Sequence, residues 1–207
     1  SIDSFKILTA GTGYTDGGLY TLTGGSTGAT VTVTSNVSSN IALGVTNLNS
    51  TGGLTLTSST ADTVTLTGNI TSALGIAQNG SVDVTLGTTS AITITTAASS
   101  GAIFAGNLVV AQNTQMNVGG GITITGTIDS VDSNNIRALG LQSTLGIIGT
   151  NSEIGATALL SFTANAGAAG TVTIQNLSNT SVSVKTQSGI NITGNLNLIE
   201  ADTTLDG

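Results

Sequence analysis

The chain has 207 residues, of which 38% are hydrophobic and only 6% are charged, so its surface must be polar but nearly neutral. The formal net charge is −7, and the three Lys and Arg side chains cannot neutralise a phosphate backbone, which argues against a nucleic-acid partner. The chain contains no Cys and no His, which excludes disulfides, thiolate zinc sites and imidazole catalysis. We therefore expect a protein that is not an enzyme.

No apolar run reaches the ~20 residues that a membrane-spanning helix needs, so we expect no membrane span. The chain begins at Ser1 rather than at Met and stops at Gly207, and we expect it to be a fragment or a processed product.

Alternation of apolar and polar residues is the dominant pattern, and it predicts short, half-buried β-strands. In chain order the alternating segments are 19–23, 29–34, 54–57, 64–67, 82–86, 92–95, 122–125, 172–174, 182–184 and 190–193. Thr makes up about a fifth of the chain, and its β-branched side chain favours strands. Between the segments lie Gly-containing turns such as Asn79-Gly80, and no Pro interrupts any ladder.

These features predict an all-β, elongated fold of short strands: a trimeric β-helix or β-prism-like shaft with small β-sandwich-like parts. We divide the chain into an N-terminal β module at 1–40, a β-rich region at 41–100, a shaft-like repeat at 101–150 and a C-terminal β region at 151–207. The third region includes a non-strand segment at 136–148, which loses the alternation and predicts a loop or one helical turn.

Imperfect internal repeats run through the chain. Residues 121–126 are echoed at 189–194, and a Gly-Asn-Ile/Leu pattern occurs at 68–70, 106–108 and 194–196. The three occurrences of this pattern are 38 and 88 residues apart, which is not one period, so the repeats do not indicate a solenoid of constant coil length.

An oxygen-rich segment contains Asp129 and Asp132 together with Ser130, Ser133 and Asn134. Such segments can bind Ca²⁺, but the spacing and the bidentate Glu of an EF-hand are missing. We favour turns in which the Asp and Asn side chains bind nearby backbone N–H groups, and we interpret Asp202 and Asp206 in the same way.

The remaining chemical groups do not form a recognisable catalytic set. The acids Asp83, Glu153 and Glu200 are scattered, and neither Lys6 nor Lys185 lies in a Ser-x-x-Lys motif. The glycines at 11–14 predict a turn rather than a phosphate cradle, and the glycosylation sequons at 36–38, 69–71 and 191–193 arise by chance in such a composition. We expect no catalytic, cofactor-binding or metal-binding residue.

Two segments resemble parts of tailed-phage proteins. Residues 10–33, with Gly-Thr-Gly-Tyr and Thr-Gly-Gly-Ser, look like a module common in tailed-phage structural proteins. Residues 106–128 resemble the G-N-L-x-V and I-x-I-x-G-T-I shaft repeats of phage tail fibres. The resemblance implies a homotrimeric shaft in the virion, with other virion proteins and a host-surface receptor as further partners. No receptor-binding tip, intramolecular chaperone or strict shaft period is recognisable.

Two alternatives have the same composition. One is a monomeric β-solenoid passenger of a bacterial surface adhesin or autotransporter. The other is an extracellular pilus subunit that donates residues 2–8 as a strand to its neighbour.

Overall fold

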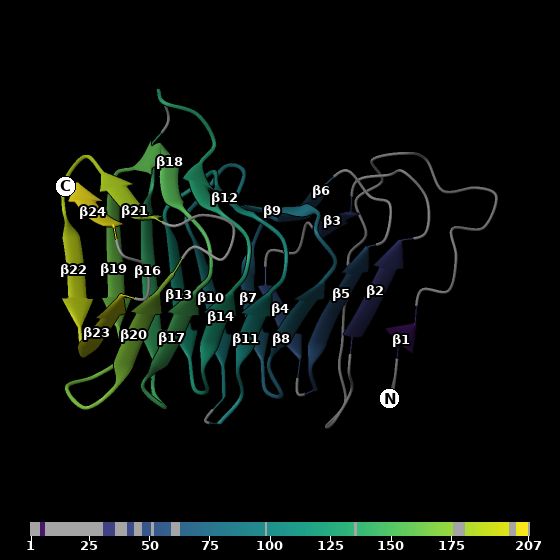
Figure 1. Ribbon diagram of the computed structural model, residues 1–207. Helices are drawn as coiled ribbons and strands as arrows, with labels where there is room; N and C mark the ends of the chain where they lie inside the picture. Colours follow the sequence, from purple (N-terminus) through teal and green to yellow (C-terminus); the bar gives the residue numbers. More distant parts are fainter. Residues whose placement is uncertain are drawn as a thin grey trace.

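The computed structural model describes residues 5–6, 31–35, 41–43, 47–50, 52–58, 63–97, 99–134, 136–175, 181–198 and 202–206. Within them every regular element is a β-strand, and every strand pairing is parallel. The strands form three sheets that the chain visits in turn, so the described residues wind as a β-solenoid (Figure 1). The prediction of an all-β fold is confirmed.

We name the sheets A, B and C. Sheet A contains β1 (Phe5–Lys6), β2 (Val31–Ser35), β5 (Leu54–Ser58), β8 (Ile76–Asn79), β11 (Ala102–Phe104), β14 (Ile122–Ile124), β17 (Ile147–Thr150), β20 (Thr171–Ile174) and β23 (Asn195–Leu198). Sheet B contains β3 (Ile41–Leu43), β6 (Thr63–Leu66), β9 (Asp83–Leu86), β12 (Leu108–Val110), β15 (Ile128–Ser130), β18 (Ile154–Leu159), β21 (Ser181–Thr186) and β24 (Asp202–Asp206). Sheet C contains β4 (Asn47–Ser50), β7 (Asn69–Ser72), β10 (Ile92–Thr96), β13 (Thr114–Val118), β16 (Ala138–Ser143), β19 (Ser161–Asn165) and β22 (Ile190–Thr193).

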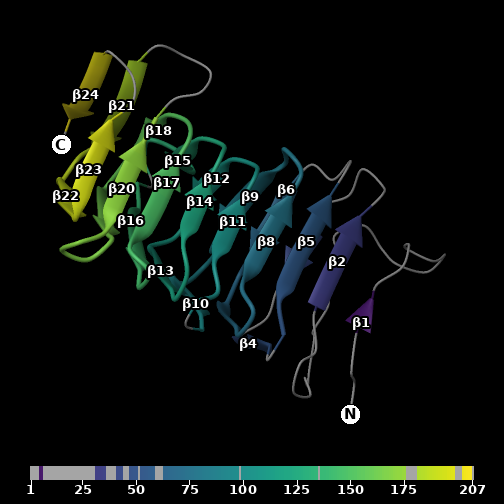
Figure 2. The ribbon, with the colours of Figure 1, turned by 60° about the horizontal axis from the view of Figure 1, so that its bottom comes forward.

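Each coil runs from sheet A to sheet B to sheet C, and the next coil lies on top of it. Figure 2 shows the strands of sheet A side by side in chain order along the stack. Sheet B therefore lies opposite the connections that lead from sheet C back to sheet A. We call these connections the C–A edge; its described residues are 52–53, 73–75, 97, 99–101, 119–121, 144–146, 166–170 and 194.

The hydrophobic core is the interior of the solenoid, and it is built by alternation. In β10 the burial pattern alternates, with Ile92 and Ile94 at 2% or less exposure. Because the strands are parallel and in register, each inward residue lies on an inward residue of the next coil, as Phe104 does on Ile124. These stacks of aliphatic side chains give one continuous core within a single chain.

The length of a coil is not constant. Ala102 pairs with Ile122, 20 positions later, whereas Ile154 pairs with Val184, 30 positions later. The connections absorb most of the difference, but the pairing of β18 with β21 also shifts register within the strands: Ile154 pairs with Val184, whereas Leu159 pairs with Thr186. The Gly-Asn-Ile/Leu repeats also lie in three different sheets, at β7, before β12 and before or in β23, so their spacings of 38 and 88 residues do not measure a coil.

The expectation for residues 136–148 was wrong. This segment contains all of β16 and the start of β17, not a loop or a helical turn. Leu139 and Leu141 do point inward, but Gly140 takes an outward position and Ser143 an inward one, which hides the alternation. A Cβ at residue 140 would lie 2.1 Å from Oε1 of Gln115, whose side chain covers this glycine.

The three sheets continue through the positions at 101 and 151 where the sequence suggested boundaries between regions. The expected alternating segment at 19–23 lies outside the described residues, as does most of the region at 1–40. The other alternating segments coincide with strands, from β2 to β22.

A pair of substitutions in β14 tests the direction of the side chains. Ile124 is fully buried between Phe104 and Thr150, so Ile124→Asp should lower the free energy of unfolding by at least about 3 kcal/mol because the charge has no partner there. Its neighbour Thr123 faces outward, and Thr123→Asp should stay within about 1 kcal/mol of the parent. Urea denaturation followed by circular dichroism measures both; equal losses would contradict the inward–outward assignment.

Candidate functional site

In the oxygen-rich segment, Asp132 forms a local turn, whereas Asp129 binds the next coil. Oδ1 of Asp132 accepts a hydrogen bond of 2.8 Å from the backbone N–H of Asn134, which is the Asx turn expected from the sequence. Oδ1 of Asp129, in β15, accepts a bond of 2.9 Å from the N–H of Thr157 in the next coil. Ser130 points into the core, where its Oγ accepts a bond from the N–H of Arg137. The described residues contain no group of three or more Asp, Glu, His or Cys placed to hold a metal ion.

The other acids are also tied to neighbouring coils. Oδ1 of Asp83 accepts a 2.8 Å bond from the side-chain amide of Asn107. Glu153 lies 3.8 Å from Nζ of Lys185, and both side chains are at least a third exposed, so this pair contributes little to stability. Glu200 lies outside the described residues, and Asp206 is exposed at the end of β24. Among the described residues, no three acids lie together.

Charge is nevertheless distributed unevenly over the three sheets. Apart from Lys6 in β1 of sheet A, the charged residues of the described solenoid lie in sheet B or in the connections that flank it, and they are Asp83, Asp129, Asp132, Arg137, Glu153, Lys185, Asp202 and Asp206. The strands of sheet A from β2 to β23 and all strands of sheet C contain no charged residue. Two sheets and the edge between them are therefore neutral over most of the stack.

The Gly-Asn-Leu motif has a structural role at the connection from sheet A to sheet B. A Cβ on Gly106 would lie 1.9 Å from the carbonyl oxygen of Val82, so only glycine fits there. Asn107 then links three coils: its Nδ2 binds Asp83, and its Oδ1 accepts a 2.9 Å bond from the N–H of Thr127 in the next coil. The motif is thus explained by coil stacking rather than by a ligand.

Other Asn side chains bind the next coil in the same way. Oδ1 of Asn69 accepts from the N–H of Thr93, and Oδ1 of Asn113 accepts from the N–H of Ala138. Asn69 is the acceptor residue of one glycosylation sequon, and Asn191 of another is exposed in β22. The sequon at 36–38 and the glycine turn at 11–14 lie outside the described residues.

Gln78 is a buried polar residue that the sequence pattern did not reveal. It occupies an inward position among apolar neighbours. It is fully buried, and its Oε1 accepts bonds from the N–H groups of Ala105 and Gly106. Its Nε2 donates to the carbonyl of Gly80, a glycine with a φ of 105°. All of its polar atoms are used within the fold, so Gln78 stabilises the corner and offers no group to a ligand.

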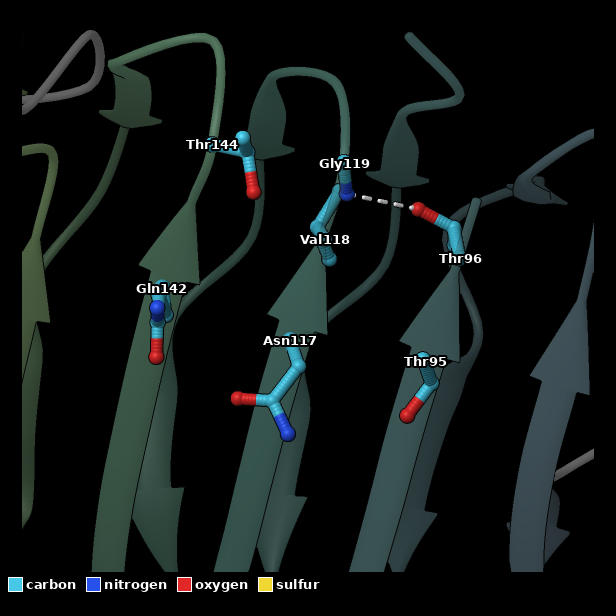
Figure 3. Close-up of a pocket in the computed structure, with 7 residues that line it drawn as sticks. All are labelled: Thr95, Thr96, Asn117, Val118, Gly119, Gln142 and Thr144. Carbon is cyan, nitrogen blue, oxygen red and sulfur yellow. Dashed lines mark hydrogen bonds between the residues drawn. The ribbon is translucent and has the colours of Figure 1, made fainter. Parts of the chain in front are cut away.

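A shallow depression of about 230 Å³ lies at the end of sheet C, lined by Thr95, Thr96, Asn117, Val118, Gly119, Gln142 and Thr144. Figure 3 shows that these residues come from three adjacent strands, β10, β13 and β16, and the turns after them. The hydrogen bond drawn in Figure 3 runs from the N–H of Gly119 to Oγ1 of Thr96, at 3.0 Å. The lining is uncharged and mixes hydroxyl and amide groups with apolar surface, and it contains no acid, base or activated nucleophile.

The depression could not be read from the sequence because its members are more than 20 positions apart and meet only through the register of Thr95 with Asn117 and of Asn117 with Gln142. Asn117 is held by a 3.2 Å bond from Nε2 of Gln115 in the same strand. The arrangement offers amide and hydroxyl groups on a flat sheet and no means to activate a bond.

Comparison with protein-family models, with curated proteins and with solved structures found no match for this chain. Among the described residues there is no helix long and apolar enough to cross a membrane.

A test of the coil-linking role compares two Asn residues. Asn107→Ala removes the acceptor of the Thr127 N–H and the donor to Asp83, and it should cost about 1–2 kcal/mol of unfolding free energy. Asn117→Ala removes only a contact within its own strand on the outer face and should cost less than about 0.5 kcal/mol. Chemical denaturation of both variants gives the comparison, and a cost at Asn117 as large as that at Asn107 would contradict the assignment.

Chelation tests the interpretation of the acidic segment. Because Asp129 and Asp132 already accept backbone hydrogen bonds, we expect EDTA to leave the melting temperature unchanged. Differential scanning calorimetry with and without added Ca²⁺ measures this directly. A melting temperature that rises with Ca²⁺ and falls with EDTA, and does neither in Asp129→Asn, would replace the turn interpretation with a metal site.

Proposed function

We propose that this chain is a segment of a non-enzymatic extracellular stalk, which holds a recognition part of a larger assembly away from the surface that carries it. The observation that supports this best is the coil stack itself: the core is closed within the chain and continues from coil to coil without a change of architecture. A structure of this kind grows in one dimension, and each coil contacts only its neighbours.

The outer surface agrees with such a role. Outward positions of sheets A and C are occupied mainly by Thr, Asn, Gln and Gly, which interact with water without attracting ions. The polar side-chain groups of Gln78, Asn107 and Asp129 form hydrogen bonds between coils. Polar side chains that bind neighbouring coils, rather than line a cleft, are typical of a spacer.

Two kinds of assembly could contain this stalk, a virion appendage and a bacterial surface adhesin. The tail-fibre motifs favour a virion appendage, in which the chain would form a homotrimer with other virion proteins and a host-surface receptor as partners. The closed core favours a passenger of a bacterial surface adhesin, because one chain already buries its apolar residues and needs no interleaved partner. In a fibre, three complete solenoids would therefore pack side by side. Sandwich-like parts of the expected shaft would have to lie outside the described residues, since the described strands all pair in parallel.

Deleting one whole coil tests the stalk. Ala102 is in register with Ile122, so removing residues 102–121 joins Gly101 to Ile122 and leaves Gly101 in the place of Gly121. We expect this variant to fold, to keep its β-sheet circular dichroism and to be shorter by about 4.8 Å along the stack, which is the spacing of neighbouring strands.

The matched control removes residues 102–111, which is half of that coil. This deletion places a strand of the wrong sheet on the stack, so cooperative unfolding should be lost. Small-angle X-ray scattering and thermal denaturation measure both variants. If the whole-coil deletion unfolds the protein as completely as the half-coil deletion, the coils are not interchangeable spacer units and the proposal fails.

A further inference from the structure

The four most exposed large hydrophobic side chains of the described residues lie on the C–A edge or on the adjoining sheet A, away from the charges around sheet B, whereas the less exposed Val131 and Leu205 lie next to and in sheet B. Large hydrophobic side chains that remain exposed include Leu74 at 66%, Leu145 at 57%, Ile147 at 60% and Ile103 at 51%. Leu74 and Leu145 lie on the C–A edge, and Ile103 and Ile147 point outward from the adjoining sheet A. Leu74 and Ile103 lie in adjacent coils, and Leu145 and Ile147 lie together beyond the intervening coil of β14. Single exposed apolar residues are ordinary, but these two pairs on one side of the stack form an interrupted apolar strip.

Small residues keep this strip accessible. Between Leu74 and Leu145 the described edge consists of the glycines at 75, 101 and 119–121 together with Ala97, Ser99, Ser100 and Thr144. Beyond Leu145 the connection at 166–170 reads Ala-Gly-Ala-Ala-Gly. A Cβ on Gly120 would lie 2.7 Å from the backbone of Gly101, so the coils are in close contact here and no side chain projects between them. Another molecule could approach the edge closely.

The charges indicate which molecule fits. The chain carries ten acids against three bases, and the described charged residues from Asp83 to Asp206 surround sheet B, which is opposite the C–A edge. Two copies that met through sheet B would bring Asp83, Asp129 and Glu153 of one copy toward those of the other. Two copies that meet along the C–A edge keep their acidic sheets apart and cover the apolar strip of both.

We infer that the C–A edge, with the adjoining outer face of sheet A, is the surface through which a second copy of this chain packs side by side. The copies run in the same direction, because a stalk has one attached end and one distal end; this point rests on the proposed function. Three copies around one axis satisfy the same arrangement, with every sheet B facing outward.

Charge substitutions test this surface. Leu74→Asp combined with Leu145→Asp changes two exposed loop positions and should weaken association at least tenfold without lowering the melting temperature. Thr85→Asp places the same type of charge on the outer face of sheet B, in register with Thr65 and Val109, and should leave association unchanged. Sedimentation equilibrium of the full chain gives the constants. A monomeric parent chain at about 100 μM, or equal weakening by Thr85→Asp, overturns the inference.

A crosslinking experiment checks the orientation. The chain has no native Cys, so Leu145→Cys introduces a single thiol at the edge, and Thr85→Cys introduces one on sheet B. Under mild oxidation we expect covalent dimers from Leu145→Cys and none from Thr85→Cys, because parallel copies bring the same residue of each chain together. Dimers from Thr85→Cys alone would overturn the inference. The stalk proposal is tested separately, since a monomer that tolerates the whole-coil deletion keeps the stalk and loses only this interface.

Discussion

The parallel register between coils is the constraint on which the rest of this structure depends. Each strand hydrogen-bonds to the strand one coil earlier and one coil later, so an inward residue is always stacked on an inward residue. A shift of the register by one residue would expose a whole row of aliphatic side chains. Side-chain bonds such as that from the Thr127 N–H to Asn107 reinforce the same register at the corners, where the backbone ladder is interrupted.

Once the core is enclosed by this register, the outer faces are free to differ. Sheet B collects the charges, and sheets A and C remain neutral over most of their length. The proposed stalk uses the repetition of the coils, whereas the proposed contact between copies uses the difference between the faces. The two proposals therefore depend on different features of the same solenoid, and one can fail without the other.

Alternation alone was sufficient to locate most strands but not their arrangement. Segments such as 92–95 and 122–125 alternate clearly, and both are strands with buried isoleucines. The strands within residues 136–148 were not predicted because Gly140 stands at an outward position and Ser143 at an inward one. Gln115 covers Gly140, and the Ser143 hydroxyl donates to the carbonyl of Gly120 in an adjacent coil. The Gly-Asn repeats were recognised, but since they mark corners of different sheets, their spacing concealed the coil length.

The sequence by itself determined that this is a Thr-rich, all-β chain with few charged residues and without thiol or imidazole chemistry, because composition and two-residue periodicity do not depend on which strands pair. Only the tertiary structure decided that the strands are parallel and that one chain closes its own core. It also decided that Thr95, Asn117 and Gln142 become neighbours and that the described charged residues other than Lys6 lie in or beside sheet B. The physical reason is that coils of 20 to 30 residues are set by register between distant strands, and this register leaves no fixed period in the sequence.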